Sequence, residues 1–169
     1  MKTATHVFAR TVAAALLLAG GSARAGAPAP GQPAIDFQAP ALNGGTVKLS
    51  SLRGKVVLVD FWASWCEPCK KELPRLAKMA KKLHGNGIEI LAINVDTDRH
   101  AAEEFLHKNG VDLNVLLDPS GSVVGRYDPP KMPTSYVVDR EGVIRHVNAG
   151  FEEGDEAKIE HQLTALASR

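Results

Sequence analysis

Apolar residues along this chain of 169 residues alternate between strand-like and helix-like spacing. Mostly apolar runs at residues 56–63 and 88–95 predict two strands that are buried on both faces of a sheet. Apolar residues at helical spacing and helix-ending residues predict helices at residues 70–83, 99–109 and 155–168, with a helical turn at 122–127. This alternation predicts an α/β fold.

Two antiparallel hairpins are expected where short strand-like segments flank turn-forming residues. The paired segments are 35–37 with 46–49 near the start of the domain, and 135–139 with 143–147 near its end. Residues 26–33 contain repeated Pro and Gly and are predicted to form an extended leader. Residues 34–169 are then expected to form a single domain.

The first 25 residues have the pattern of a secretory signal. Two basic residues precede a short apolar run, and Ala23 and Ala25 supply the small residues that a signal peptidase recognises. The run is too short to span a bilayer, so cleavage before Gly26 is expected. The alternative is that this segment stays attached as a membrane anchor.

The net charge of the chain bears on which partners it can bind. The whole chain has a net charge of +1, and loss of Lys2, Arg10 and Arg24 with the signal segment leaves −2. Such a near-neutral chain is not expected to bind nucleic acid or a charged membrane surface. No later segment is long and apolar enough for stable membrane insertion after cleavage.

Cys66 and Cys69 are the only cysteines and lie between a predicted strand and a predicted helix. A helix N-terminus stabilises a thiolate, which favours a reactive role for this pair. A disulfide between residues so close in sequence closes a very short loop and therefore adds little stability. In an oxidising compartment structural disulfides would be permitted, so one closely spaced pair favours thiol–disulfide exchange.

Metal binding is the main alternative for a Cys-x-x-Cys motif. A zinc site needs two further ligands, and the six histidines offer no closely spaced pair. A copper carrier that uses both thiolates and a histidine is a second alternative, which a count of bound copper would test. We expect neither a metal nor another cofactor.

The run from Asp60 to Pro74, together with Met132-Pro133-Thr134 downstream, resembles the thioredoxin superfamily. More narrowly, it is similar to the exported TlpA/ResA/DsbE branch of thiol–disulfide oxidoreductases, from about Pro33 onward. This resemblance implies a thioredoxin-like fold, with a central mixed sheet flanked by helices and an added N-terminal β-hairpin.

Position within the motif assigns the attack on a substrate disulfide to Cys66 and the resolving role to Cys69. The resolving thiol needs a proton acceptor, and two carboxyl groups are candidates. Asp60 interrupts an apolar strand, where burial would raise its pKa, and thioredoxin carries an Asp at the matching position. Glu72 matches a buried acid of the ResA-like members. Both candidates stay open, with a slight preference for Glu72.

A substrate-binding groove beside the cysteines is implied by the resemblance. Met132-Pro133, followed by Thr134, is similar to the family's cis-proline segment, which exposes backbone groups to an incoming chain. Without the resemblance, Pro133 could equally follow a trans bond. Trp65 is expected to flank the same groove.

The two residues between the cysteines bear on the direction of electron flow. Strongly oxidising relatives carry a His there, whereas this chain has Glu67 and Pro68. A negative neighbour disfavours the thiolate, which predicts a reducing couple. The resemblance implies a periplasmic reductase of oxidised proteins, serving cytochrome c maturation or metallochaperone thiols and recharged by a membrane-embedded thiol carrier.

Other enzyme classes are also open. A disulfide oxidase or isomerase would use the same dithiol in another direction. A peroxidase of the peroxiredoxin type needs Thr or Ser three residues before the attacking cysteine, and this chain has Ala63 there.

Overall fold

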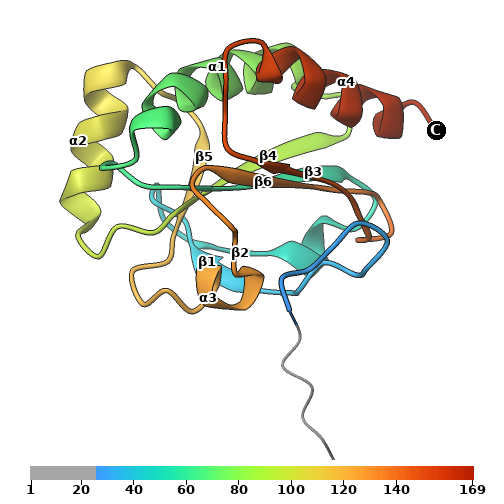
Figure 1. Cartoon of the computed structure of the whole chain (residues 1–169), viewed down its shortest axis with the longest axis horizontal. Helices are drawn as coiled ribbons and strands as arrows, with labels where there is room; N and C mark the ends of the chain where they lie inside the picture. Colours follow the sequence, from blue (N-terminus) through green and yellow to red (C-terminus); the bar gives the residue numbers. More distant parts are fainter. Residues whose placement is uncertain (1–25) are drawn as a thin grey trace, which may run out of the picture.

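The computed structural model of the protein describes residues 26–169, and the predicted signal segment at residues 1–25 lies outside them. A five-stranded mixed sheet in the order β5-β4-β3-β6-β7 forms the centre (Figure 1). Strands β3, β4 and β5 are parallel, whereas β6 is antiparallel to both β3 and β7. The strands are β3 (Val56–Trp62), β4 (Ile88–Asn94), β5 (Asn114–Leu117), β6 (Thr134–Val138) and β7 (Ile144–Ala149).

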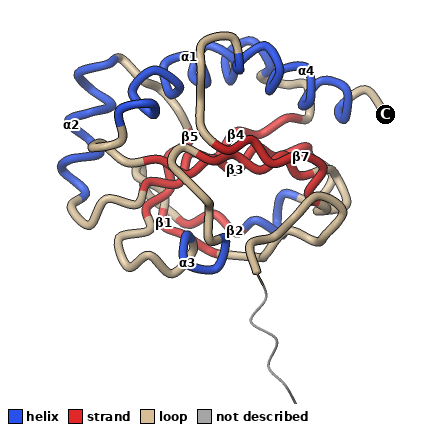
Figure 2. The backbone as a smooth tube through the Cα atoms, viewed as in Figure 1, coloured by secondary structure: helices blue, strands red, loops and turns tan. Residues whose placement is uncertain are grey.

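Different layers cover the two faces of this sheet (Figure 2). One layer contains the helices α1 (Glu67–Leu83), α2 (Arg99–Asn109) and α4 (Asp155–Ala167). The other contains the antiparallel hairpin β1 (Gln38–Pro40) and β2 (Thr46–Lys48), the 3-10 helix η1 (Leu49–Leu52), and α3 (Val124–Tyr127). The mixed sheet, the helices and the added hairpin confirm the thioredoxin-like fold.

The central strand β3 separates two hydrophobic cores. Leu58 and Trp62 belong to the core beneath the helices, while Val59 and Phe61 belong to the core on the hairpin side. Side chains alternate along a strand, so Asp60 faces the helix layer between Leu58 and Trp62. This places a carboxyl group on the same side of the sheet as α1.

Two elements begin three residues away from the sequence-based expectation, and one strand was not predicted. Helix α1 begins at Glu67 instead of residue 70, because Pro68 is well suited to a first helical turn. The first hairpin strand is Gln38–Pro40 instead of residues 35–37, since the Phe37 carbonyl accepts a hydrogen bond from Leu49 N at 3.0 Å outside the ladder. Strand β5 was not predicted, because four residues are too few to show a period.

The end of the predicted leader pairs with the start of β7. Gly31 N donates to the Ile144 carbonyl at 2.8 Å, and Ile144 N donates to the Gln32 carbonyl at 2.9 Å. Ile144 lies level with the start of β3, so the chain enters the domain at the opposite end of the sheet from Cys66. None of the helices formed by residues 26–169 has the length and apolar character needed to cross a bilayer.

Candidate active site

Cys66 and Cys69 form a disulfide at the junction between β3 and α1, with their Cα atoms 5.3 Å apart. Cys66 is the N-cap of α1, and its Sγ accepts a hydrogen bond from Cys69 N at 3.3 Å. A thiolate at Cys66 would meet the same N–H group and the positive end of the helix dipole. Cys66 is 5 % exposed and Cys69 0 %, so only Cys66 offers any surface to a substrate, and that surface is small.

The loop before the cysteines is fixed by Asp96, a residue that the sequence reasoning missed. Ser64 donates to the Asp96 carboxylate through both its backbone N, at 2.9 Å, and its hydroxyl, at 3.1 Å. Asn94 Nδ2 adds a third hydrogen bond at 2.8 Å. Asp96 lies just past the end of β4, the parallel neighbour of the strand β3 that leads to the dithiol. An Asp at this position in the sequence is the signal that could have identified this residue.

The Met132–Pro133 peptide bond is cis, as the resemblance implies. Thr134 pairs with Phe61, so Pro133 lies level with Trp62, just before the dithiol motif. Met132 is half-buried and packs against the core that includes both cysteines. The structure therefore brings this segment, although distant in sequence, to the dithiol.

The backbone groups beside the cis bond differ in whether they are free to form a hydrogen bond with an incoming chain. The Pro133 carbonyl accepts a hydrogen bond from Gly150 N at 2.7 Å, and the Thr134 hydroxyl donates to the Lys131 carbonyl at 2.7 Å. Within residues 26–169, the Met132 N–H and C=O have no hydrogen-bond partner. Strand-like pairing with an incoming chain stays a prediction, for which the Met132 backbone groups are available within the described residues while the Pro133 carbonyl is already occupied.

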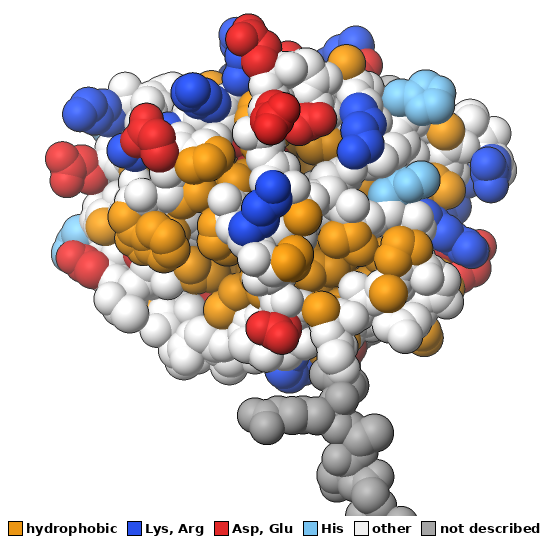
Figure 3. Space-filling view, viewed as in Figure 1, with side chains coloured by type: hydrophobic (Ala, Val, Ile, Leu, Met, Phe, Trp, Pro, Cys, Tyr) orange, Lys and Arg blue, Asp and Glu red, His pale blue; other side chains and the backbone are white. Residues whose placement is uncertain are grey.

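An exposed apolar side chain, Trp65, directly precedes Cys66 in the chain. Trp65 is 67 % exposed, which makes it the exposed large hydrophobic side chain of the described residues. Figure 3 shows hydrophobic side chains spread across the middle of one face, with charged groups mainly toward its rim. Exposure of Trp65 is compatible with its predicted place at the groove, and that role stays a prediction.

Asp60 and Glu72 are both buried, at 0 % and 1 % exposed, on the helix side of the sheet. Among the described residues, 26–169, neither oxygen of Asp60 finds a hydrogen-bond partner, and neither does Oε2 of Glu72. Burial, followed by the charge of Glu72, raises the pKa of Asp60 well above its usual range. Burial, followed by the charge of Asp155, raises the pKa of Glu72 to about 8. A carboxyl group that titrates near neutral pH can exchange a proton with a thiol one helical turn away.

Glu67 lies at the exposed start of α1 and forms an ion pair with Lys70 at 2.8 Å. The hydrogen bond from Lys70 and its positive charge lower the pKa of Glu67. Glu67 is therefore ionised near the dithiol, as the sequence reasoning assumed, but Lys70 offsets part of its charge. Pro68 occupies the first turn of α1.

The two sulfurs can carry electrons without a further group, because a dithiol loses two electrons when it closes to a disulfide. Across residues 26–169, no group of three or more His, Cys, Asp or Glu side chains is arranged to hold a metal ion.

A dithiol at a helix N-terminus, beside a cis-proline on a thioredoxin-like sheet, defines a thiol–disulfide oxidoreductase. Residues 30–147 match the AhpC/TSA family, and the chain belongs to that family. It is 38 % identical over 120 residues to the thiol–disulfide oxidoreductase ResA of Bacillus subtilis, covering 71 % of this chain and 67 % of that protein. The chain is therefore a thiol–disulfide oxidoreductase of the ResA/DsbE type.

Solved structures agree with this assignment. A candidate thiol:disulfide interchange protein DsbE from Chlorobium tepidum superposes with a TM-score of 0.78 and 35 % identity, covering 83 % of this chain and 99 % of the other. A candidate protein disulfide isomerase from Bacteroides thetaiotaomicron gives 0.78 at 29 % identity, covering 84 % and 92 %.

Proposed function

We propose that this protein is an exported reductase of protein disulfides. The observation that carries the proposal is the local charge at the dithiol: Glu67 lies next to Cys66 in sequence, and the hydrogen bond and positive charge of Lys70 lower its pKa, so that it is ionised. Negative charge disfavours the thiolate and therefore the dithiol as an end product, which makes the dithiol a donor of electrons.

The exchange would proceed in two balanced steps. The Cys66 thiolate attacks one sulfur of a substrate disulfide, forms a mixed disulfide and releases the first substrate thiolate. The Cys69 thiolate then attacks Cys66 Sγ, which breaks the mixed disulfide and releases the second substrate thiolate. Two electrons pass to the substrate, and the chain is left with the Cys66–Cys69 disulfide that the structure contains.

The second step requires that Cys69 lose its proton inside a closed environment. Glu72 follows Cys69 by one helical turn and is the candidate acceptor, with Asp60 as the alternative. An ionised Glu72 takes the proton from the Cys69 thiol, and the protonated acid later returns it to solvent. The unpartnered Glu72 Oε2 supports this role.

The proposed compartment and partners follow from the signal-like residues 1–25 and from the ResA/DsbE type. We propose that the mature protein works in the periplasm on oxidised protein substrates, such as cytochrome c precursors or metallochaperones. A membrane-embedded thiol carrier would restore the dithiol after each cycle.

The reduction potential tests the proposed direction. The protein is equilibrated with a series of dithiothreitol or glutathione redox buffers, and the fraction of disulfide is measured by alkylation of free thiols. We expect a value nearer to about −270 mV than to about −120 mV, the two ends of the range of known exchangers. A potential above about −180 mV would overturn the reductase proposal.

A disulfide oxidase or isomerase is the second candidate. Two observations favour it: Lys70 offsets part of the Glu67 charge, and one similar solved structure is described as a candidate protein disulfide isomerase. The same titration separates the two candidates, because an isomerase or oxidase would have a potential of about −180 mV or higher.

A further inference from the structure

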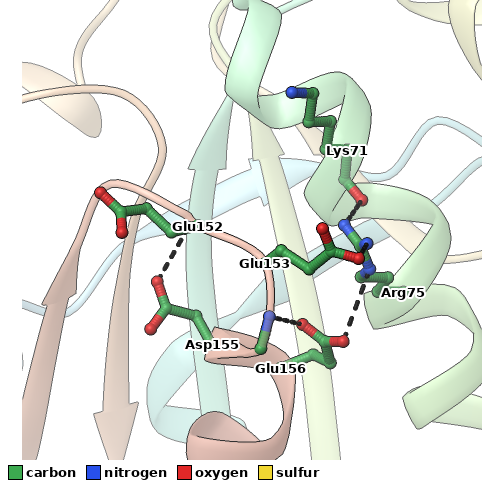
Figure 4. Close-up of polar contacts among 7 residues, drawn as sticks. Lys71, Arg75, Glu152, Glu153, Asp155 and Glu156 are labelled. Carbon is green, nitrogen blue, oxygen red and sulfur yellow. Dashed lines mark hydrogen bonds and ion pairs between the residues drawn. The ribbon is translucent and has the colours of Figure 1, made fainter.

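The Arg75 side chain links the loop between β7 and α4 to α1 through ion pairs (Figure 4). Its guanidinium contacts Glu153 Oε1 at 3.4 Å and Glu156 Oε1 at 3.5 Å, and it donates to the Lys71 carbonyl at 3.2 Å. The same guanidinium lies over the Phe151 ring, 5.6 Å from its centroid. One side chain of α1 therefore fixes this loop and the first turn of α4.

The contacts of Arg75 with Glu153 and Glu156, which we call the Arg75 clamp, hold the segment that contains Asp155 against α1. Arg75 follows Glu72 by one helical turn, so both side chains leave α1 on neighbouring positions of one face. Its two acidic partners, Glu153 and Glu156, flank Asp155 in sequence, so Asp155 is brought to the part of α1 that carries Glu72. Asp155 Oδ2 accepts a hydrogen bond from Glu152 N at 2.9 Å, which fixes its carboxylate (Figure 4).

Asp155 is a carboxylate at a helix N-terminus. It is half-buried in the first turn of α4, where the positive end of the helix dipole stabilises a carboxylate. Within residues 26–169 it forms no ion pair of its own, because Arg75 contacts its two acidic neighbours instead. Its charge is therefore available to act on a nearby buried group.

The charged groups that act on Glu72 come from three elements. Asp60 approaches from β3, Asp155 from α4, and Arg75 belongs to the same helix as Glu72. Asp60 is fully buried and Arg75 is engaged by glutamates, which leaves the half-buried Asp155 as the charged group that acts on Glu72. Glu72 thus lies between a buried acid and a partly solvated one.

We propose that Asp155 is a positioning residue for the thiol–disulfide exchange, held by the Arg75 clamp so that its carboxylate strengthens Glu72 as the base that takes the Cys69 proton. The proposal rests on the reductase function and on Glu72 as the proton acceptor. A fixed negative charge beside Glu72 disfavours the ionised form of that acid, which makes its carboxylate a stronger base toward the Cys69 thiol. Asp155 itself touches no reacting sulfur.

The test uses the disulfide form of the full chain and measures Glu72 directly. Infrared difference spectra across pH 5 to 9 follow the carboxyl band that disappears in Glu72→Gln. Asp155→Asn keeps an oxygen that can accept the Glu152 N–H bond but removes the charge. We expect the Glu72 midpoint to move down by about half a pH unit or more in Asp155→Asn.

Three further variants make the test specific. Glu152→Gln removes a charge from the same loop, but the Glu152 side chain makes no hydrogen bond or ion pair within the described part of the chain, so the midpoint should stay. Asp155→Glu keeps the charge and should restore the parental midpoint. Asp155→Ser supplies a second uncharged variant if Asp155→Asn fails to fold. The pH profile of mixed-disulfide resolution should shift with the infrared midpoint.

Two results would overturn the proposal. One is an unchanged Glu72 midpoint in a folded, uncharged Asp155 variant, and the other is an equal shift in Glu152→Gln. Because the infrared midpoint is measured without turnover, it is independent of the reduction potential. A potential above about −180 mV would therefore remove the reductase function while the electrostatic coupling could still be observed.

Discussion

Replacement of Glu72 by Gln should remove a large part of the pH dependence of folding stability. The unfolded chain releases the Glu72 proton near its ordinary pKa of 4.5, whereas the folded protein holds it up to about 8. Between these values the folded state binds more protons than the unfolded state, so stability falls as the pH rises. Below 4.5 the contribution is fully present, and above 8 it is lost.

The size of this effect follows from the shift. Each pH unit of difference corresponds to about 1.4 kcal/mol, so about three and a half units correspond to roughly 5 kcal/mol. The side chain is only 1 % exposed, so little of the effect is lost to solvent screening. This is comparable with the whole folding free energy of many domains, which is about 5–15 kcal/mol.

Urea unfolding of the disulfide form at pH 5, 6, 7 and 8 measures this term. Parent and Glu72→Gln are compared at each pH, because titrating groups that do not interact with Glu72 contribute nearly equally to both and cancel, so that the difference reports Glu72 together with its neighbour Asp60. A buried glutamine adds a cost that does not change with pH, so the slope and not the offset is the relevant quantity. Glu152→Gln, an exposed replacement in the neighbouring loop, should keep the parental slope.

The outcome that refutes this reasoning is specific. If the stability difference between parent and Glu72→Gln changes by less than about 1 kcal/mol from pH 5 to pH 8, Glu72 does not hold a proton in the folded protein at neutral pH. In that case Glu72 could not serve as a proton acceptor with a raised pKa, and Asp60 would become the remaining candidate.

Three further experiments test the rest of the site. Cys69→Ala should trap a mixed disulfide on Cys66, seen by non-reducing electrophoresis, whereas Cys66→Ala should trap none; equal trapping would reverse or abolish the assigned roles. Glu67→His should raise the reduction potential by about 30 mV or more, because a cation favours the thiolate; an unchanged potential would contradict the charge argument. Asp96→Ala should cost about 2 kcal/mol in urea unfolding and speed alkylation of the reduced cysteines, since Ser64 loses both hydrogen bonds; an unchanged stability would show that the loop needs no such anchor.

Much of the sheet could be predicted because its central strands are buried on both faces. The mostly apolar strands β3 and β4 were predicted to within one residue at their ends. Only Asp60 breaks the β3 run, and its burial follows from a strand at the centre of the sheet. Strand β5 lacked such a signal, because it is a segment of only four residues at the edge of the sheet. So short an apolar segment cannot be distinguished from a loop by its sequence pattern.

Contacts between distant segments were predictable only where a family resemblance supplied them. The cis bond at Pro133 and the proximity of that segment to the dithiol came from the resemblance, because composition favours a trans bond. Asp96 was missed although it fixes the loop before Cys66, since an Asp after a strand is usually a turn residue. Its role is visible only when the adjacent parallel strands bring it to Ser64.

Asp155 shows why an acid in a charged run is difficult to interpret from sequence. The run Glu152-Glu153-Gly154-Asp155-Glu156 has the composition of a solvated helix start, and four of its residues carry the same charge. The fold separates them: Glu153 and Glu156 contact Arg75, Glu152 contributes its backbone N–H, and the Asp155 charge acts on Glu72. The effect of each carboxylate depends on the group it faces, and that arrangement arises only when α4 packs beside α1.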